Sequence, residues 1–389
     1  AHVTSQTDGP EAKRVNRQED ASCASTAQVP GGAGVAHGTK AVEPLPAHAP
    51  HEKARGWSPC EVAPGVIQVR LPLPFALDHV NAWLIRDGNA WTLVDTGVSD
   101  VATRDVWEGI SSVLGGRPVR RVIATHYHPD HIGLAGWFCT SFGAELWCSQ
   151  VEWLQARMWT LDPPQAAEAA CEGFYRRAGV PADTLRELAP VARLYSTLVD
   201  PPPLAFHGLR DGEEITIDGG SWRVIIGRGH SPGHVCLYSP DRSILISGDQ
   251  VLPSITPNVS VDHNEPDADP VADFMHSLSR LAQVNEHVLV LPSHGRAFVG
   301  LRGRVGELEA HHRQRLLEVH RACARPRTAF QIMSGMFPRM LDAHQATFAV
   351  GESVAHLNNL IHAGSLRRHR PEAGPDLYEK TAETLRGLS

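Results

Sequence analysis

The sequence has no hydrophobic stretch long enough to cross a membrane. A transmembrane helix needs about 18 or more consecutive apolar residues, and the 389-residue chain contains no such run. A secretory signal needs an apolar core of roughly 7–15 residues behind positive charges, and the N-terminal part shows none. Cysteine is scarce, with seven residues, an odd number, and no CxxC pair. We therefore expect no membrane partner, reduced thiols rather than a disulfide framework, and a cytoplasmic location.

A surplus of basic charge is missing as well. The formal net charge is −7, whereas proteins that bind nucleic acids usually carry a basic face. The hydrophobic share of 42% and the charged share of 20% are those of an ordinary globular protein, and the length allows one large domain and a smaller one. We therefore expect a small-molecule substrate and do not favour nucleic acid as a partner.

Composition divides the chain into three parts. Residues 1–55 are rich in Ala, Gly, Pro, Ser and Thr, so we predict a disordered tail that cannot bury enough apolar surface to fold. Residues 56–305 are predicted to form the main domain, with a helical insertion at about 149–203. Residues 306–389, where the composition changes again, are predicted to form a small C-terminal domain.

The main domain has more predicted strands than helices. Each half shows several short apolar runs followed by a helical pattern, and an Asp-Gly-Asn hairpin turn lies at 87–89. The predicted strand segments are GVIQVRLPL, NAWLIRDGNAWTLVDTG (two strands), RRVIAT, EITI, SWRVIIG, HVCLYS, SILISGD and HVLVLPSHG. This order predicts an α/β fold in which two sheets pack together with helices outside.

The insertion is predicted to contain three helices separated by Pro and Gly, namely VEWLQARMWTL, PQAAEAACEGFYRRAG and ADTLRELAPVARLYSTLV. It carries the large apolar side chains Trp153, Met158, Trp159, Phe174 and Tyr175. Two interpretations remain open. These side chains line a substrate pocket under a hydrophobic lid, or they only pack the insertion onto the main domain.

The C-terminal domain has the pattern of a winged-helix module. Three helical segments (GELEAHHRQRLLEVHRAC, TAFQIMSGMF and QATFAVGESVAHLNNLIHAG) precede a hairpin pattern around 371–374. Such modules often bind DNA, but the basic residues Arg367, Arg368 and Arg370 are few and acidic residues follow them. We therefore favour packing, or contact within a homodimer, over DNA binding.

The segment VIATHYHPDHIG, residues 122–133, places four metal-binding side chains within six positions after an apolar run: His126, His128, Asp130 and His131. Imidazole and carboxylate are good ligands for zinc and similar ions. A lone HxH after a strand is usually just a polar loop. Four candidates at one strand end favour a metal site.

Three later segments repeat the same order of apolar strand, small residue and metal-binding side chain. They contribute His230 in VIIGRGHSPGH, Asp249 in SILISGDQ and His294 in VLVLPSHGR. Open binding sites form where strand ends meet in layered α/β folds. The sequence therefore predicts that these residues join the first segment in one metal site.

Together the HxHxDH segment, GHSPGH, SGD and PSHG resemble the metallo-β-lactamase superfamily, a broad group of hydrolases. The resemblance covers about 57–305 and keeps the order of the family's motifs. It implies an αββα sandwich with two metal ions at one edge of the sheets. It also implies that one ion is held by His126, His128 and His230, the other by Asp130, His131 and His294, with Asp249 between them.

The same resemblance implies residues that support the ligands. Asp95 in LVDTG would lie beneath the site and accept hydrogen bonds from ligand groups, and a turn aspartate at a strand end is the less favoured alternative. His234, in the same turn as His230, is expected to support the site rather than bind metal. His79 resembles a position at the pocket rim and stays unassigned, and the substrate-binding residues are unknown.

The complete ligand set indicates a hydrolase. Two divalent ions, with zinc favoured and iron or manganese as alternatives, would share a water whose pKa falls towards neutrality, and the bridging hydroxide would attack the substrate. Asp130 is our catalytic candidate, holding this water and moving its proton. No G-x-S-x-G nucleophile elbow is convincing here.

The branches of the superfamily differ in their ligands. Lactamases usually lack the bridging aspartate or replace a ligand, di-iron reductases usually carry Glu where this chain has His128, and nucleases add a nucleic-acid grip. The resemblance is therefore strongest to ester, thioester and lactone hydrolases such as glyoxalase II and acyl-homoserine lactonases, and the insertion suggests an apolar acyl group. The alternatives are an oxidoreductase resembling the mononuclear iron persulfide dioxygenases, and the nuclease or β-lactamase branch.

Overall fold

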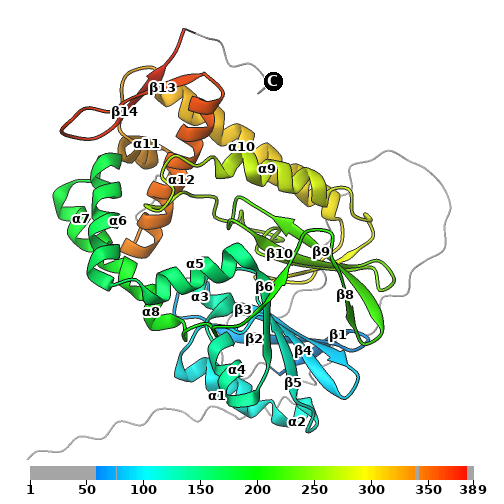
Figure 1. Cartoon of the computed structure of the whole chain (residues 1–389). Helices are drawn as coiled ribbons and strands as arrows, with labels where there is room; N and C mark the ends of the chain where they lie inside the picture. Colours follow the sequence, from blue (N-terminus) through cyan, green and yellow to red (C-terminus); the bar gives the residue numbers. More distant parts are fainter. Residues whose placement is uncertain (1–57, 76, 338–340, 383–389) are drawn as a thin grey trace, which may run out of the picture. The chain divides into compact units, whose positions relative to one another are not determined.

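The computed structural model describes residues 58–75, 77–337 and 341–382 (Figure 1). The predicted disordered tail, 1–55, lies outside the described residues. Two sheets make up the main part of the protein, and a third, small sheet lies near the C-terminus.

The first sheet has seven strands in the order of the chain, antiparallel from β1 to β4 and parallel from β4 to β7. Its strands are β1 (Cys60–Ala63), β2 (Val66–Pro72), β3 (His79–Asp87), β4 (Ala90–Val94), β5 (Val119–Ile123), β6 (Glu145–Ser149) and β7 (His207–Leu209). The predicted hairpin joins β3 to β4, and its Gly88 has a φ of +62°. Three short strands, β1, β6 and β7, were not predicted.

The second sheet has five strands in the order β12-β11-β10-β9-β8, antiparallel except for the parallel pair β11–β12. All five were predicted. They are β8 (Glu214–Ile217), β9 (Gly220–Gly227), β10 (His234–Ser239), β11 (Ile244–Gly248) and β12 (Leu289–Pro292).

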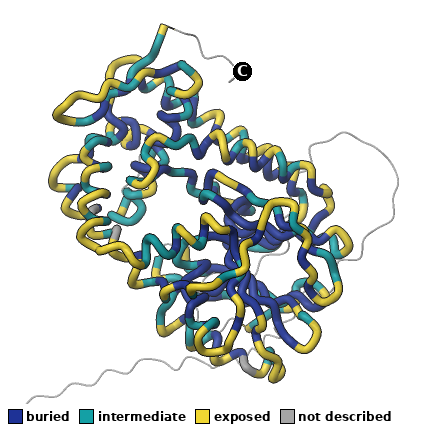
Figure 2. The backbone as a smooth tube through the Cα atoms, viewed as in Figure 1, coloured by how far each residue is buried: buried dark blue, intermediate teal, exposed yellow. Residues whose placement is uncertain are grey.

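The two sheets share an apolar core. Trp83 and Ile85 of β3 belong to the same buried cluster as Trp222 and Val224 of β9, and all four are fully buried. Figure 2 shows this burial as dark blue along the strands. Truncating a buried Trp to Ala costs about 3–5 kcal/mol, so each tryptophan contributes a large share of the stability of a typical domain.

Helices cover the outer faces of both sheets. On the first sheet lie α1 (Val101–Gly109), α2 (Ser111–Leu114), α3 (Pro129–Ile132) and α4 (Ala135–Phe142), and their Trp107 and Phe138 pack on the strands. On the second lie α9 (Pro270–Leu281) and α10 (Leu301–Ala322). Asp269 caps α9 by accepting from the Ala272 amide, and Phe274 packs into the core below. The predicted α/β fold, an αββα sandwich, is confirmed.

The insertion begins as predicted and then departs from the prediction. Two predicted helices are present as α5 (Gln150–Leu161) and α6 (Pro164–Ala178). The third is divided into α7 (Ala182–Leu188), a 3₁₀ turn η1 (Ala189–Arg193) and α8 (Leu194–Leu198), so that prediction was wrong. Pro190 lies in the break, and proline removes a backbone donor and disfavours helix in the residue before it.

The C-terminal part has the predicted order of three helices and a hairpin, with α10 starting five residues earlier than residue 306. After α10 come α11 (Ala329–Met336), α12 (Ala343–His362), β13 (Leu366–His369) and β14 (Leu377–Lys380). Buried side chains of α12 belong to one apolar cluster together with side chains of α6, α7 and α9. The insertion and the C-terminal helices therefore share a core.

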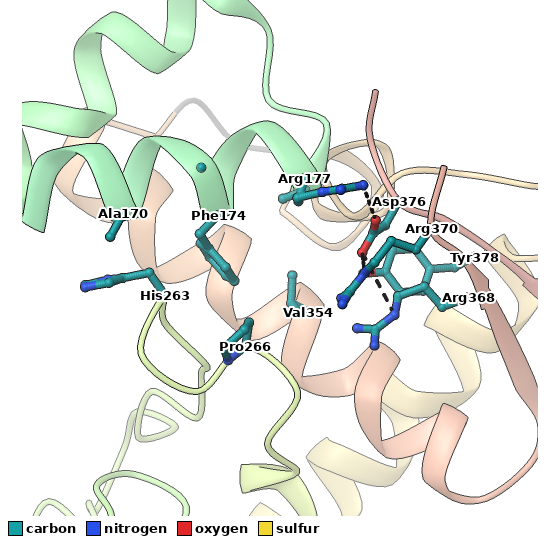
Figure 3. A pocket seen from close by; sticks show the side chains of 12 residues that line it. Ala170, Phe174, Arg177, His263, Pro266, Val354, Arg368, Arg370, Asp376 and Tyr378 are labelled. Atoms are coloured by element: carbon teal, nitrogen blue, oxygen red, sulfur yellow. Dashed lines mark hydrogen bonds and ion pairs between the residues drawn. The ribbon is translucent and has the colours of Figure 1, made fainter. Parts of the chain in front are cut away.

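A cavity of about 250 Å³ lies between α6 and the C-terminal hairpin (Figure 3). At its edge the Asp376 carboxylate, almost fully buried, pairs with Arg177 of α6 and with Arg370. Arg368 pairs with Asp267 at 2.6 Å. The basic residues at 368 and 370 thus pair with aspartates of the same chain, the exposed Asp267 and the buried Asp376.

Two further findings concern membranes and thiols. None of the described helices is long and apolar enough to cross a lipid bilayer. Five described cysteines are free thiols, namely Cys139, Cys148, Cys171, Cys236 and Cys323. Cys60 is disulfide-bonded, so the expectation of reduced thiols rather than a disulfide framework was wrong at this residue.

A buried histidine pair joins α10 to α12. His312 Nδ1 lies 3.2 Å from His356 Nε2, and the other nitrogen of His356 donates to the Glu352 carbonyl at 2.8 Å. Both side chains are fully buried. Burial, together with neighbouring His311 and Arg315, lowers the pKa of His312 to about 3 and that of His356 to about 4. Both rings are therefore neutral in the folded protein at pH values where they are charged in the unfolded chain.

We expect this pair to make the protein acid-labile. Its contribution to the free energy of unfolding is full above the ordinary pKa of 6.5 and is lost as the pH falls towards 4, because protons then bind the unfolded chain. Between pH 7 and pH 5 the native protein should lose about 3 kcal/mol more than the double variant H312L/H356L. Urea unfolding of both proteins at the two pH values measures this difference. Glu352, whose pKa burial raises to about 7, has the opposite sign but is present in both proteins. Equal pH dependence would contradict the prediction.

Candidate metal centre

All seven predicted ligand residues follow strand ends at one edge of the two sheets. The HxHxDH segment follows β5, and the other three ligands follow β9, β11 and β12. In the second sheet Gly227 of β9 pairs with His234 of β10, and Gly248 of β11 pairs with Pro292 of β12. The ends of these strands therefore lie side by side, which brings distant parts of the chain to one place.

Three histidines form the first potential ligand set. His126 Nε2 lies 2.9 Å from His128 Nδ1 and 3.1 Å from His230 Nε2. Burial and the neighbouring imidazoles hold the pKa of His126 well below 6.5, so its ring is neutral. Neutral imidazoles can turn lone pairs towards a common point, which is the arrangement that a cation such as zinc needs. We call these residues the three-histidine set.

Asp130, His131 and His294 form the second set. Asp130 Oδ2 lies 3.4 Å from His131 Nε2 and 3.3 Å from His294 Nε2. Burial lowers the pKa of His294, but Asp249 and Asp130 outweigh this effect and raise it to about 10. The carboxylates of Asp130 and Asp249 thus attract a positive charge strongly to this set. We call it the acidic set.

Asp249 lies between the two sets. Its Oδ2 is 3.6 Å from His230 Nε2 of the three-histidine set, and 3.4 Å from His294 Nε2 and 3.6 Å from His131 Nε2 of the acidic set. Asp249 Oδ1 and His131 Nε2 are buried, and neither has a hydrogen-bond partner among the described residues. Buried polar atoms are rarely left unpaired. Their convergence with the other donor atoms fits cations bound among these side chains.

Asp95 orients His131 from below. Its Oδ2 lies 2.8 Å from His131 Nδ1 and accepts from the Thr125 hydroxyl at 2.9 Å, and its Oδ1 accepts from the Thr125 amide at 2.8 Å. The Asp95 backbone has a φ of 62°, a left-handed conformation that costs a non-glycine residue about 1–3 kcal/mol. Because His131 donates to Asp95 through Nδ1, its Nε2 is free to face the other ligands.

His234 supports Asp249 rather than joining either set. Its Nε2 accepts from the Asp249 amide at 3.0 Å, and the ring is fully buried beside His126. Gly248 has a φ of +52°, and a Cβ there would collide with the His234 ring. Only glycine therefore allows the chain to pass His234 and place Asp249.

Backbone carbonyls hold two further histidines. His230 Nδ1 donates to the Asn258 carbonyl at 2.8 Å, and His294 Nδ1 donates to the His79 carbonyl at 2.9 Å. Such bonds set which ring nitrogen faces the centre. His79, unassigned from the sequence, thus contributes a backbone group.

Glu152, in the first turn of α5, was missed by sequence reasoning. Its carboxylate is fully buried and accepts from the Ser231 hydroxyl at 2.7 Å, the Gly233 amide at 2.6 Å and the Tyr127 amide at 2.8 Å. Burial raises its pKa to about 7, and the three donors oppose that rise. The sequence signal was the pair Ser149 and Glu152, which is typical of a helix cap. Ser149 does cap α5, but the glutamate turns towards the ligand segments.

Two of the insertion aromatics pack against neighbouring parts of the protein, and a third lines a cavity that contains none of the candidate ligand residues. Trp153 stacks on Phe206 and donates to the Pro203 carbonyl, and Tyr175 is buried in the core, so both pack the insertion onto its surroundings. Phe174 lines the cavity of Figure 3.

Comparison with known proteins agrees with this geometry. Residues 76–294 match the family described as the metallo-beta-lactamase superfamily, and residues 316–381 match its "Metallo-beta-lactamase-like, C-terminal domain". A "Beta-lactamase domain protein" from Burkholderia ambifaria of known structure is 43% identical, with a TM-score of 0.77 over 86% of this chain and 97% of that one.

Two curated relatives carry functional names. The "Probable metallo-hydrolase YqjP" of Bacillus subtilis is 26% identical over 76% of this chain and 92% of its own length. The "Atrochrysone carboxyl ACP thioesterase AgnL7" of Paecilomyces divaricatus is 23% identical over 63% of this chain and 60% of its own length. The superfamily match spans more than half of the chain, and the resemblance seen in the sequence is confirmed: this protein belongs to the metallo-β-lactamase superfamily.

Proposed function

We propose that this protein is a dinuclear metal-dependent hydrolase that cleaves an ester, thioester or lactone with an apolar acyl group. The position of Asp249 Oδ2, within 3.6 Å of a histidine nitrogen from each ligand set, carries the proposal. One carboxylate oxygen there can serve two cations. A single-iron oxidoreductase would use one set and leave the other without a role.

The candidate site residues have different roles in the proposed reaction. Two bound cations, zinc being our expected metal, would polarise the scissile carbonyl and lower the pKa of a water molecule. Asp130, with 18% of its side chain exposed against 9% for Asp249, can accept a hydrogen bond from the attacking water and take its proton on the carboxylate. Asp95 and His234 keep His131 and Asp249 in place through the bonds described above.

Apolar side chains near the centre support an acyl substrate. Phe75 stacks on His344 at 4.7 Å, and Phe348 packs edge-on against the same ring at 4.8 Å with 40% of its surface exposed. Burial lowers the pKa of His344, and the charge of Asp130 partly opposes this shift, so the two side chains interact electrostatically. Leu77, 42% exposed, lies two residues before His79, whose carbonyl binds His294. An apolar group would cover these exposed surfaces.

Among hydrolases of this type, the thioesterase relative favours a thioester as the substrate class. This relative acts, by its name, on an acyl group held by a carrier protein. We extend only the bond type to the present protein, since the two chains share 23% identity.

Metal analysis followed by a substrate panel tests the proposal. We expect two zinc-like ions per chain, hydrolysis of acyl thioesters, aryl esters or lactones, and loss of activity after exhaustive chelation. The panel should include β-lactams. One iron per chain with oxygen uptake would overturn the proposal, as would full activity without metal, and hydrolysis of β-lactams alone would overturn the substrate class.

A further inference from the structure

The helical insertion holds the backbone between two ligands of the three-histidine set. Tyr127 lies between His126 and His128. Its amide donates to Glu152 Oε2 at 2.8 Å, and its carbonyl accepts from the Tyr195 hydroxyl of α8 at 2.6 Å. One peptide unit leads from His126 to Tyr127 and the next leads on to His128, so each is held by one side chain of the insertion.

The same carboxylate also holds the segment that carries the third ligand. Glu152 Oε1 accepts from the Ser231 hydroxyl and from the Gly233 amide, directly after His230. A Cβ at Gly233 would collide with Val151, so this turn lies tightly against the start of α5. One side chain thus bonds to both segments that supply the three-histidine set.

A carboxylate is required for this arrangement. All three partners of Glu152 are donors, two amides and one hydroxyl. Glutamine has the same shape but offers one acceptor oxygen and an NH₂ group, which would face a donor. Replacing Glu by Gln therefore breaks at least one bond and leaves a buried donor unpaired.

We propose that Glu152 is a positioning residue that fixes the spacing of His126, His128 and His230, assisted by Tyr195. This inference rests on the proposed metal binding. The insertion is then part of the support of the metal centre, in addition to any role as a lid. The acidic set makes no direct bond to Glu152 or Tyr195 among the hydrogen bonds of the described residues, so the effect should be confined to one of two ions.

A purely structural role for Glu152 gives a different expectation. In that case E152Q would lower the stability of the fold, but the folded protein would bind both ions as tightly as the native chain. The two roles are therefore separated by metal affinity measured on folded protein, without reference to activity.

Calorimetric titration of metal-free protein with Zn²⁺ provides the test. H128A identifies which binding event belongs to the three-histidine set. We expect E152Q to weaken that event by about 10–100-fold, the usual effect of losing a group that orients a ligand, and to leave the other event nearly unchanged. Y195F, which keeps the charge and removes one hydroxyl, should weaken the same event less. E187Q, at an exposed position on α7, is the matched control and should change neither.

The results of this titration distinguish a failure of the inference from a failure of the proposed function. Two native binding events that E152Q leaves unchanged would overturn the positioning role and leave the proposed function standing. No Zn²⁺ binding by the native protein would overturn the proposed function itself. Equal weakening of both events would also overturn the inference, since it requires selectivity. Should E152Q fail to fold, full affinity of Y195F for both ions would overturn it.

Discussion

Replacing Asp249 by Asn is expected to lower turnover on the order of 10³-fold and to weaken the binding of at least one metal ion. The loss of the negative charge removes several kcal/mol of charge stabilisation, and about 1.36 kcal/mol corresponds to a tenfold change in rate. The carboxylate oxygen Oδ2 lies within 3.6 Å of nitrogens from both ligand sets, so both cations of the proposed centre would depend on its negative charge. The amide keeps the volume and loses the charge. Turnover on the best substrate of the panel and the number of ions per chain measure the two effects.

Asp241 provides the matched control for this variant. It is exposed and lies before β11, whereas Asp249 follows the same strand at its other end. D241N should keep native turnover and native metal content. If D249N kept both ions and lost less than about tenfold in turnover, the bridging position of Asp249 would be wrong.

The candidate ligand residues could be picked out in the sequence because their signal is local. Each of His230, Asp249 and His294 follows an apolar strand, and strand ends are where side chains from distant segments meet. The pairing of Gly227 with His234 and of Gly248 with Pro292 places them at one edge, as this pattern requires.

Glu152 could not be found in this way, because its role depends on where a helix packs. In the sequence it stands three residues after Ser149, and that spacing predicts only a helix cap. Its carboxylate reaches Ser231 and Gly233, about eighty positions along the chain, because α5 lies against that turn. No periodicity or motif in the sequence encodes such a contact.

The position at which α12 packs could not be predicted from the sequence either. The pattern predicted a helix in a small C-terminal domain, and packing was favoured for that domain over DNA binding. The contact of His344 with Phe75, and the packing of Gly351 against the 260–261 segment, place this helix beside the main domain. The break at η1 has a simpler cause, since Pro190 disfavours helix in the residue before it.

Replacing Asp130 by Asn is expected to lower turnover by about 10²–10⁴-fold with both ions still bound at saturating metal, the range typical for losing a general base. Burial alone would raise the pKa of Asp130, but His131 and His294 lower it below its ordinary value, so the carboxylate is charged at neutral pH and can accept a hydrogen bond from the attacking water. Asparagine fills the same space and cannot take up the proton. Turnover measured at saturating substrate and metal, with ions counted on the same sample, gives the result.

The roles of Asp249 and Asp130 are distinguished by the effect of each variant on the metal content. D249N should lose metal and turnover together, whereas D130N should lose mainly turnover, because the ion pairs of Asp130 among the described residues lie within the acidic set and Asp130 is the more exposed of the two. D105N, at an exposed position on α1, should behave as the native protein. Native turnover in D130N with both ions bound would assign the proton to another group. A proportional loss of metal and turnover would make Asp130 a ligand without a separate role in proton transfer.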